Sequence, residues 1–208
     1  MEHRTSARGW APALLALLAL PLTGCDAISE ATSPQVTAQE YLFNFENTIN
    51  GWVTEGSNVD PDGSDWSIDA SQAVAAGGGQ SVAFQLDSQR EDALIWMERE
   101  FMLRSNRSYD LTMTFEFASA DWGPGEHWDL VVAAGAGRVD IDDAFHTSST
   151  ANGATVADGF RWRSFKLPTE LRTGDDGRVR IAIGVGGQSV REGIYYLDEL
   201  GVKFELLR

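Results

Sequence analysis

Strict alternation of apolar and polar side chains between residues 109 and 117 is the feature that most constrains the fold of this chain. Tyr109, Leu111, Met113, Phe115 and Phe117 are separated by Asp110, Thr112, Thr114 and Glu116. Successive side chains of a β-strand point to opposite faces. This stretch therefore predicts a strand with one face in a core and the other in water.

The same period of two recurs along the chain after residue 40, where no stretch sustains the period of an α-helix. Val179–Val185 is a second clear strand, with Arg178 and Arg180 on the face opposite its valines and isoleucines, and the preceding TGDDG at 173–177 predicts a hairpin turn. Further strands are predicted at 41–45, 66–75, 81–86, 93–103, 128–134, 138–142, 160–167 and 193–207. About ten strands of ordinary length predict an all-β fold, an antiparallel two-sheet β-sandwich of the jelly-roll type.

The N-terminus is a targeting segment and lies outside that fold. Arg4 and Arg8 precede the apolar run ALLALLALPL, which is too short to span a bilayer. The following LTGC at 22–25 resembles the lipobox of bacterial lipoproteins, whose cysteine becomes the acylated N-terminus. The resemblance implies a signal peptide at 1–24 and lipidation of Cys25. It places the protein in the bacterial cell envelope, at the periplasmic face of the inner membrane or at the outer membrane; an ordinary secretory signal is the alternative.

Length and composition limit the organisation of the chain from Cys25 onward. Residues 25–40 are small and polar, which predicts a flexible tether, and 41–208 has the length of one domain. Cys25 is the only cysteine, so no disulfide forms within one molecule. The net charge of −15 disfavours nucleic acid and anionic lipid as partners and favours cations or neutral ligands, although acidity also serves solubility alone.

Three phrases resemble the carbohydrate-binding-module and galactose-binding-like jelly rolls. They are FNFENTINGW at 43–52, GGGQSVAF at 77–84 and YYLDELGVKF at 195–204, in the order that those families show. The resemblance implies a carbohydrate-binding domain whose first and last strands lie near one another. It also implies a structural calcium near their junction, with Glu46 and Asp198 as side-chain ligands.

Asp198 is also conspicuous by its position in the last predicted strand. A simple alternation places it on the same face as Tyr196, Leu200 and Val202. An unpaired carboxylate in a core is costly, so we expect it to be paired, hydrogen-bonded, bound to metal or displaced by a β-bulge. Hydrogen bonds from backbone N–H groups or a salt bridge to an arginine are the alternatives to calcium.

A second acidic stretch, NVDPDGSDWSID at 58–69, has the spacing of a calcium loop. Asn58, Asp60, Asp62, Gly63 and Asp69 occupy the first, third, fifth, sixth and twelfth positions. The loop departs from the EF-hand because its twelfth residue is Asp and no helices flank it. An Asp-Gly turn whose side chains cap their own backbone is the alternative.

Six of the seven tryptophans come after the signal peptide, since Trp10 lies within it. An exposed indole offers a flat apolar face for a sugar ring. Trp96 shares a strand face with Glu98 and Glu100, opposite the more apolar face, and is the first candidate for a stacking platform. For each tryptophan, packing in the core is the alternative. The full set of carbohydrate-binding candidates is Trp96, Trp122, Trp128, Trp162, Glu98 and Arg161, whereas Trp52 and Trp66 are expected to pack near the first strand.

Residues for catalysis are few. Only His127 and His146 come after the signal peptide, and the chain contains neither G-x-S-x-G nor H-E-x-x-H. The sequence therefore predicts a non-enzymatic domain, and the resemblance implies that it binds carbohydrate, or else an envelope protein. The alternatives are a structural or protein-interaction module, and a glycan-processing enzyme that uses Glu98, Glu100 and Glu116 on one face.

Overall fold

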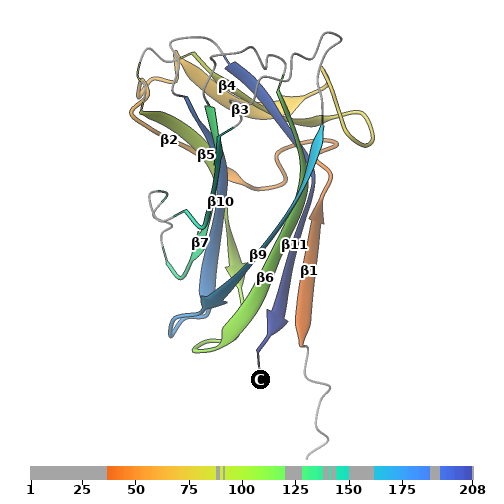
Figure 1. Cartoon of the computed structure of the whole chain (residues 1–208), viewed down its shortest axis with the longest axis vertical. Helices are drawn as coiled ribbons and strands as arrows, with labels where there is room; N and C mark the ends of the chain where they lie inside the picture. Colours follow the sequence, from red (N-terminus) through yellow and green to blue (C-terminus); the bar gives the residue numbers. More distant parts are fainter. Residues whose placement is uncertain are drawn as a thin grey trace, which may run out of the picture. The chain divides into compact units, whose positions relative to one another are not determined.

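The computed structural model describes residues 37–87, 90, 92–119, 128–137, 141, 144–149, 162–187 and 193–207. The strands are β1 (Ala38–Phe43), β2 (Val53–Ser57), β3 (Trp66–Ser71), β4 (Ser81–Leu86), β5 (Ala93–Met102), β6 (Ser108–Ser119), β7 (Trp128–Gly135), β8 (His146–Ser149), β9 (Arg163–Arg172), β10 (Arg178–Gly187) and β11 (Gly193–Leu206). They form two antiparallel sheets packed as a sandwich (Figure 1), which confirms the predicted fold class. Within the described parts of the chain, no helix has the length and apolarity needed to cross a membrane.

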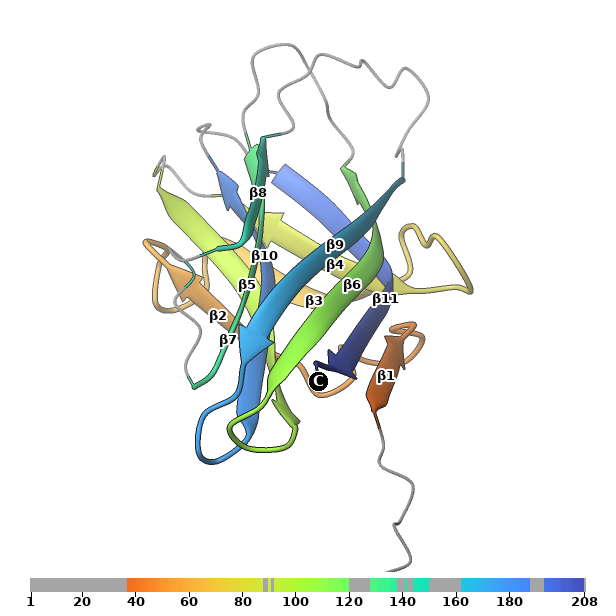
Figure 2. The ribbon, with the colours of Figure 1, turned by 60° about the horizontal axis from the view of Figure 1, so that its bottom comes forward.

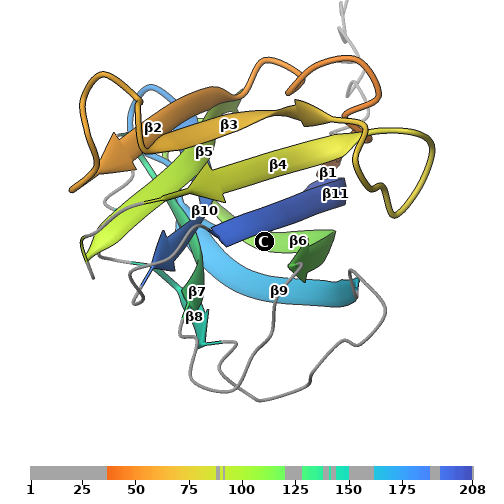
Figure 3. The ribbon, with the colours of Figure 1, turned by 90° about the horizontal axis from the view of Figure 1, so that it is seen from above.

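Sheet A has six strands, in the order β3-β4-β11-β6-β9, with β1 paired to β11 off that path. Figure 3 shows the five strands of the path in this order, and Figure 2 shows β1 beside β11. Strand β11 pairs with β6 along one edge and with β4 and then β1 along the other. Sheet B has the order β2-β5-β10-β7-β8.

The core lies between the sheets and is built from the faces that alternation predicts. The odd-numbered residues of β6 from Tyr109 to Phe117 are buried there, as are the alternate residues of β10 from Val179 to Val185. Trp52 is buried in this core and Trp66 packs partly buried against it, as expected. Edge-on ring contacts join Phe43, Trp52 and Phe101 at one end of the core.

A β-bulge in β11 corrects the predicted place of Asp198. Ahead of the bulge Tyr195 and Leu197 point into the core, and after it Leu200 and Val202 do so. The pairing with β6 shifts register between Asp198 and Gly201, so one extra residue moves the inward set from odd to even numbers. Asp198 therefore lies on the outer face of sheet A, opposite Glu116, and not among the core side chains as simple alternation predicted.

Several predicted boundaries differ from the structure. The TGDDG stretch does form a turn, but it connects β9 of sheet A to β10 of sheet B, so it is not a hairpin between paired strands. Strands β2 and β8 were not predicted, because both are short and neither contains a run of large apolar residues. The predicted strand at 138–142 lies largely outside the described residues.

We expect Gly184→Ala in β10 to lower the free energy of unfolding by about 1–3 kcal/mol, because there is no room for the added methyl group between Gly184 and β5. A Cβ at this position would collide with the carbonyl oxygen of Ile95 and lie 2.5 Å from Cβ of Trp96. Gly186→Ala is the control, since its Cβ would meet nothing closer than 3.7 Å. Denaturant unfolding of both variants checks the prediction, and equal stabilities would contradict it.

Candidate functional site

The outer face of sheet B contains the side chains that the sequence singled out on β5. Ile95, Met97 and Phe101 point into the core, while Trp96 and Glu98 point outward, so the predicted alternation is confirmed. The expectation that Trp96 is an exposed platform is corrected, because only 8% of it is exposed. It packs with Ala182 of the adjacent β10 and Ala133 of β7 beyond it, and Leu94, Ile141 and Ala144 pack against this group.

A ladder of ion pairs runs along the same face, next to Trp96. Arg180 of β10 bridges two glutamates of β5: its Nη1 lies 3.2 Å from Glu98 Oε1, and its Nη2 lies 3.4 Å from Glu100 Oε2. Arg178 continues the ladder, with Nη1 at 3.2 Å from Glu100 Oε1 and Nε at 3.6 Å from Asp176 Oδ2. The ladder forms because β5 and β10 pair directly, placing Arg180 opposite Glu100 and Ala182 opposite Glu98.

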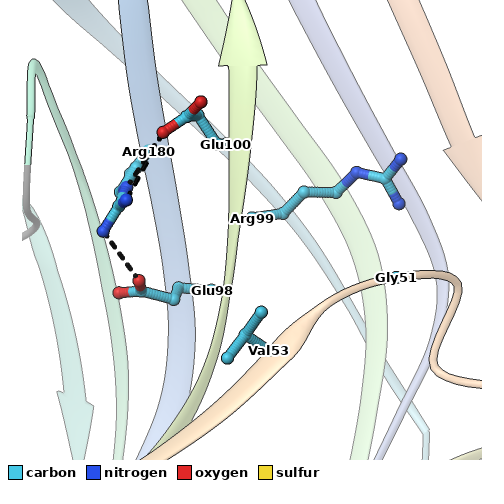
Figure 4. Close-up of a pocket in the computed structure, with 6 residues that line it drawn as sticks. All are labelled: Gly51, Val53, Glu98, Arg99, Glu100 and Arg180. Carbon is cyan, nitrogen blue, oxygen red and sulfur yellow. Dashed lines mark hydrogen bonds and ion pairs between the residues drawn. The ribbon is translucent and has the colours of Figure 1, made fainter.

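A pocket of about 290 Å³ opens beside this ladder (Figure 4). Glu98 and Glu100 and the bridging Arg180 form its polar side, and Val53, which is 56% exposed, forms an apolar wall from β2. Gly51 and Arg99 complete the lining. Carboxylate and guanidinium groups of this kind exchange hydrogen bonds with hydroxyl groups, while an aliphatic wall contacts C–H groups.

Glu116 does not belong to this pocket. It lies on the outer face of sheet A, where Ser164 Oγ donates a hydrogen bond of 2.5 Å to its Oε1. The arrangement in which Glu98, Glu100 and Glu116 share one face is therefore wrong, because β5 and β6 belong to different sheets. Glycoside hydrolysis requires two carboxyl groups that flank the scissile bond. Here the Arg180 guanidinium, and not an open space, lies between the carboxyl groups of Glu98 and Glu100 (Figure 4).

Asp198 is fully buried and is held by backbone amides, two of them from the β3–β4 loop. Its Oδ2 accepts hydrogen bonds from the N–H groups of Ala76 and Gly77, at 2.8 and 3.1 Å. Its Oδ1 accepts one from the N–H of Glu199 at 2.8 Å. Such bonds to a carboxylate stabilise the charge in a buried place. Of the two alternatives to calcium, the structure contains the backbone N–H bonds.

Glu46 approaches the same loop from the segment after β1. Both of its carboxylate oxygens lie 3.1 Å from the N–H nitrogen of Gly79. A Cβ at Gly78 would collide with the Glu46 carboxylate, and a Cβ at Gly77 would collide with Glu199. The triple glycine thus forms a cradle against which carboxylates from the segment after β1 and from β11 pack. This confirms that the two ends of the domain meet here, as the resemblance implied.

The contacts of the cradle bear on the calcium ligands that the resemblance implies. Calcium prefers hard oxygens, and Glu46 and Asp198 would supply carboxylates, but the loop groups that contact these carboxylates are the N–H groups of Ala76, Gly77 and Gly79. In the described parts of the chain, no three His, Cys, Asp or Glu side chains are grouped so that they could hold a metal. Backbone oxygens would therefore have to provide most of the coordination.

The second acidic stretch does not fit a calcium loop. Asn58 donates from Nδ2 to the carbonyl of Asp92, and Asp69 lies exposed in β3. Asp60 Oδ2 accepts a hydrogen bond from the Ser64 hydroxyl, and Asp62 Oδ1 accepts one from the Ser64 N–H. The hydroxyl and the N–H of Ser64 lower the pKa of Asp62, whose carboxylate they stabilise. The residues form a turn that caps its own backbone.

Several predicted site residues fall outside this description or on another face. Cys25, Trp122 and Arg161 lie outside the described residues, and only the backbone of Trp128 is described, at the start of β7. Trp162 is half-buried and directly precedes β9, a strand of sheet A. The pocket residues Arg180 and Val53 were not predicted as a site. Only the outward position of Arg180 was visible in the sequence.

Comparison with known proteins supports the fold. No protein-family model matches the chain, and a search of curated proteins finds no match. The K1 cleaved adhesin domain of Lys-gingipain from Porphyromonas gingivalis W83 superposes with a TM-score of 0.53 at 16% identity, covering 79% of this chain and 97% of that one. The K3 domain gives 0.55 at 13% identity, covering 80% and 98%. A structure of carbohydrate-binding modules from the β-sandwich superfamily reaches 0.49 at 16% identity, covering 80% and 61%, a score too low to support an assignment.

We expect Asp198→Asn to lower the free energy of unfolding by about 2–3 kcal/mol, because an amide group would turn a donor toward buried N–H groups. For a domain of this size, the melting midpoint would fall by roughly 5–10 °C. Asp69→Asn makes the same change of charge at an exposed strand position and should change stability little. Thermal melts of both variants check this, and equal midpoints would show that the amide contacts are unimportant.

Proposed function

We propose that this protein is a non-catalytic binding module that recognises carbohydrate on the outer face of sheet B. The observation that supports the proposal is the pocket between β2, β5 and β10, where ion-paired polar groups lie beside the exposed Val53. Its volume of about 290 Å³ suits one or two sugar rings at the edge of a longer glycan. Hydroxyl groups would bond to the glutamates, and a C–H face would lie on the valine.

The architecture agrees with a binding role. The two gingipain domains that share this fold are adhesin domains, and the sequence resembles carbohydrate-binding jelly rolls in three phrases. An interaction with an envelope protein is the alternative. The exposed apolar residues do not favour it, because Leu42 projects from sheet A whereas Val53 and Met102 project from sheet B. Single exposed apolar residues are common on protein surfaces.

The proposal includes a lipid anchor and a calcium ion. Cys25, acylated after cleavage of residues 1–24, would attach the protein to a membrane of the bacterial cell envelope. Calcium, when bound, would neutralise the carboxylates of Glu46 and Asp198 and stabilise the β3–β4 loop between them. The ion would add to the direct pairing of β1 with β11, which already joins the two ends of the domain.

We expect the full chain to bind at least one glycan on a mixed array without hydrolysing it. Glu98→Ala should weaken the binding by about tenfold or more, because a charge-assisted hydrogen bond contributes about 1.5–3 kcal/mol. Calorimetry with the glycan found on the array measures the change.

Glu170→Ala is the matched control, since Glu170 is an exposed glutamate of β9 on the other sheet. Equal losses in both variants, or the absence of any bound glycan, would contradict the proposed site. Release of shorter glycans by the wild type would instead favour the enzyme.

We expect calcium to raise the melting midpoint of the chain relative to chelator, because a ligand that binds only the folded state stabilises it. Metal analysis of the same sample should find calcium, and Glu46→Gln should reduce the response. A chain without metal, with the same midpoint in calcium and in chelator, would remove calcium from the proposal and leave the amide contacts of Asp198 as the whole explanation of its burial.

A further inference from the structure

The cationic groups beside the pocket are already engaged. All three nitrogens of the Arg180 guanidinium donate to Glu98 or Glu100, and Arg178 is paired with Glu100 and Asp176. These three carboxylates and two guanidinium groups leave the ladder with one net negative charge. An anionic sugar would therefore meet no uncommitted cation in the ladder.

The remaining cation of the lining is also committed. Arg99 donates from Nη1 to the backbone carbonyl of Asn50, and its guanidinium carbon lies 4.8 Å from the centre of the Phe43 ring. Figure 4 shows its side chain directed away from Glu98 and Arg180. Its charge is thus directed toward the end of the core and not toward the ion-pair ladder.

Glu98, in contrast, has an acceptor to spare. Its Oε1 receives the bond from Arg180 Nη1, and none of the described residues donates to its Oε2. Trp52 Nε1 is the sole buried side-chain N or O atom of the described residues that lacks a partner. The unpartnered Oε2 of Glu98 must therefore be accessible to solvent. The exposed Glu55, which lies opposite Trp96 in the pairing of β2 with β5, adds a carboxylate to those of Glu98 and Glu100 on this face.

We propose that the pocket selects the positively charged ammonium group of an amino sugar. The ammonium would donate to Glu98 Oε2, a carboxylate only 14% exposed in its side chain, and the sugar ring would lie against Val53. Partial burial strengthens such a contact relative to one in water. The inference rests on the proposed carbohydrate function and specifies its ligand class.

The test compares two probes that differ only in whether their amino groups are free or acetylated. They are a β-1,4-linked glucosamine hexamer and its fully N-acetylated counterpart. Calorimetry with the full chain at low salt and mildly acidic pH should show the free amine binding at least about fivefold more tightly. The preference should shrink as salt is raised, because ions screen the attraction. Glu98→Gln, which keeps an acceptor but removes the charge, should bring the two affinities together.

Glu170→Gln controls for the overall loss of one negative charge and should leave the preference intact. Equal affinities of the two hexamers for the wild type would overturn the amino-sugar inference while leaving carbohydrate binding in place. Binding of neither hexamer, nor of any glycan on the array, would overturn both. A preference that survives Glu98→Gln but is lost in Glu170→Gln would place the site on sheet A and also overturn the inference.

Discussion

The β-bulge at Asp198 is the local feature on which the rest of this sandwich depends. Strand β11 pairs with three others, and its fourteen residues have to present apolar side chains to the core on both sides of the bulge. Without the extra residue, one half of the strand would turn its apolar set outward. The bulge also marks the place where the edge of β11 passes from β4 to β1.

The bulge creates a buried carboxylate, and the β3–β4 loop satisfies it. Gly77 and Gly78 permit this because a side chain at either position would collide with Glu199 or Glu46. The loop N–H groups donate hydrogen bonds to Asp198 and Glu46. The β3–β4 loop thereby connects Asp198 in the last strand with Glu46, which follows the first strand.

The outer face of sheet B shows that the same alternation places ion-paired charged side chains on one surface. Positions that point away from the core on β5 and β10 hold charges, and direct strand pairing brings Arg180 between Glu98 and Glu100. Exposed ion pairs add little stability. Here these ion pairs position side chains: the bridging guanidinium holds two carboxylates at the edge of a pocket and leaves one oxygen of Glu98 accessible.

The sequence by itself determined the fold class and the inward faces of β6 and β10, because strand alternation is a local property that packing on one side makes obligatory. The resemblance to carbohydrate-binding jelly rolls also implied that Glu46 and Asp198 lie near the junction of the first and last strands, whereas their shared contact with the triple glycine is seen only in the structure. Only the tertiary structure decided that Trp96 is covered, that Glu116 lies on the other sheet, and that Arg180 bridges two glutamates. Each of these depends on strand order, on a bulge or on a loop laid over a sheet. Contacts of this kind join residues far apart in the chain, and periodicity within one strand carries no information about them.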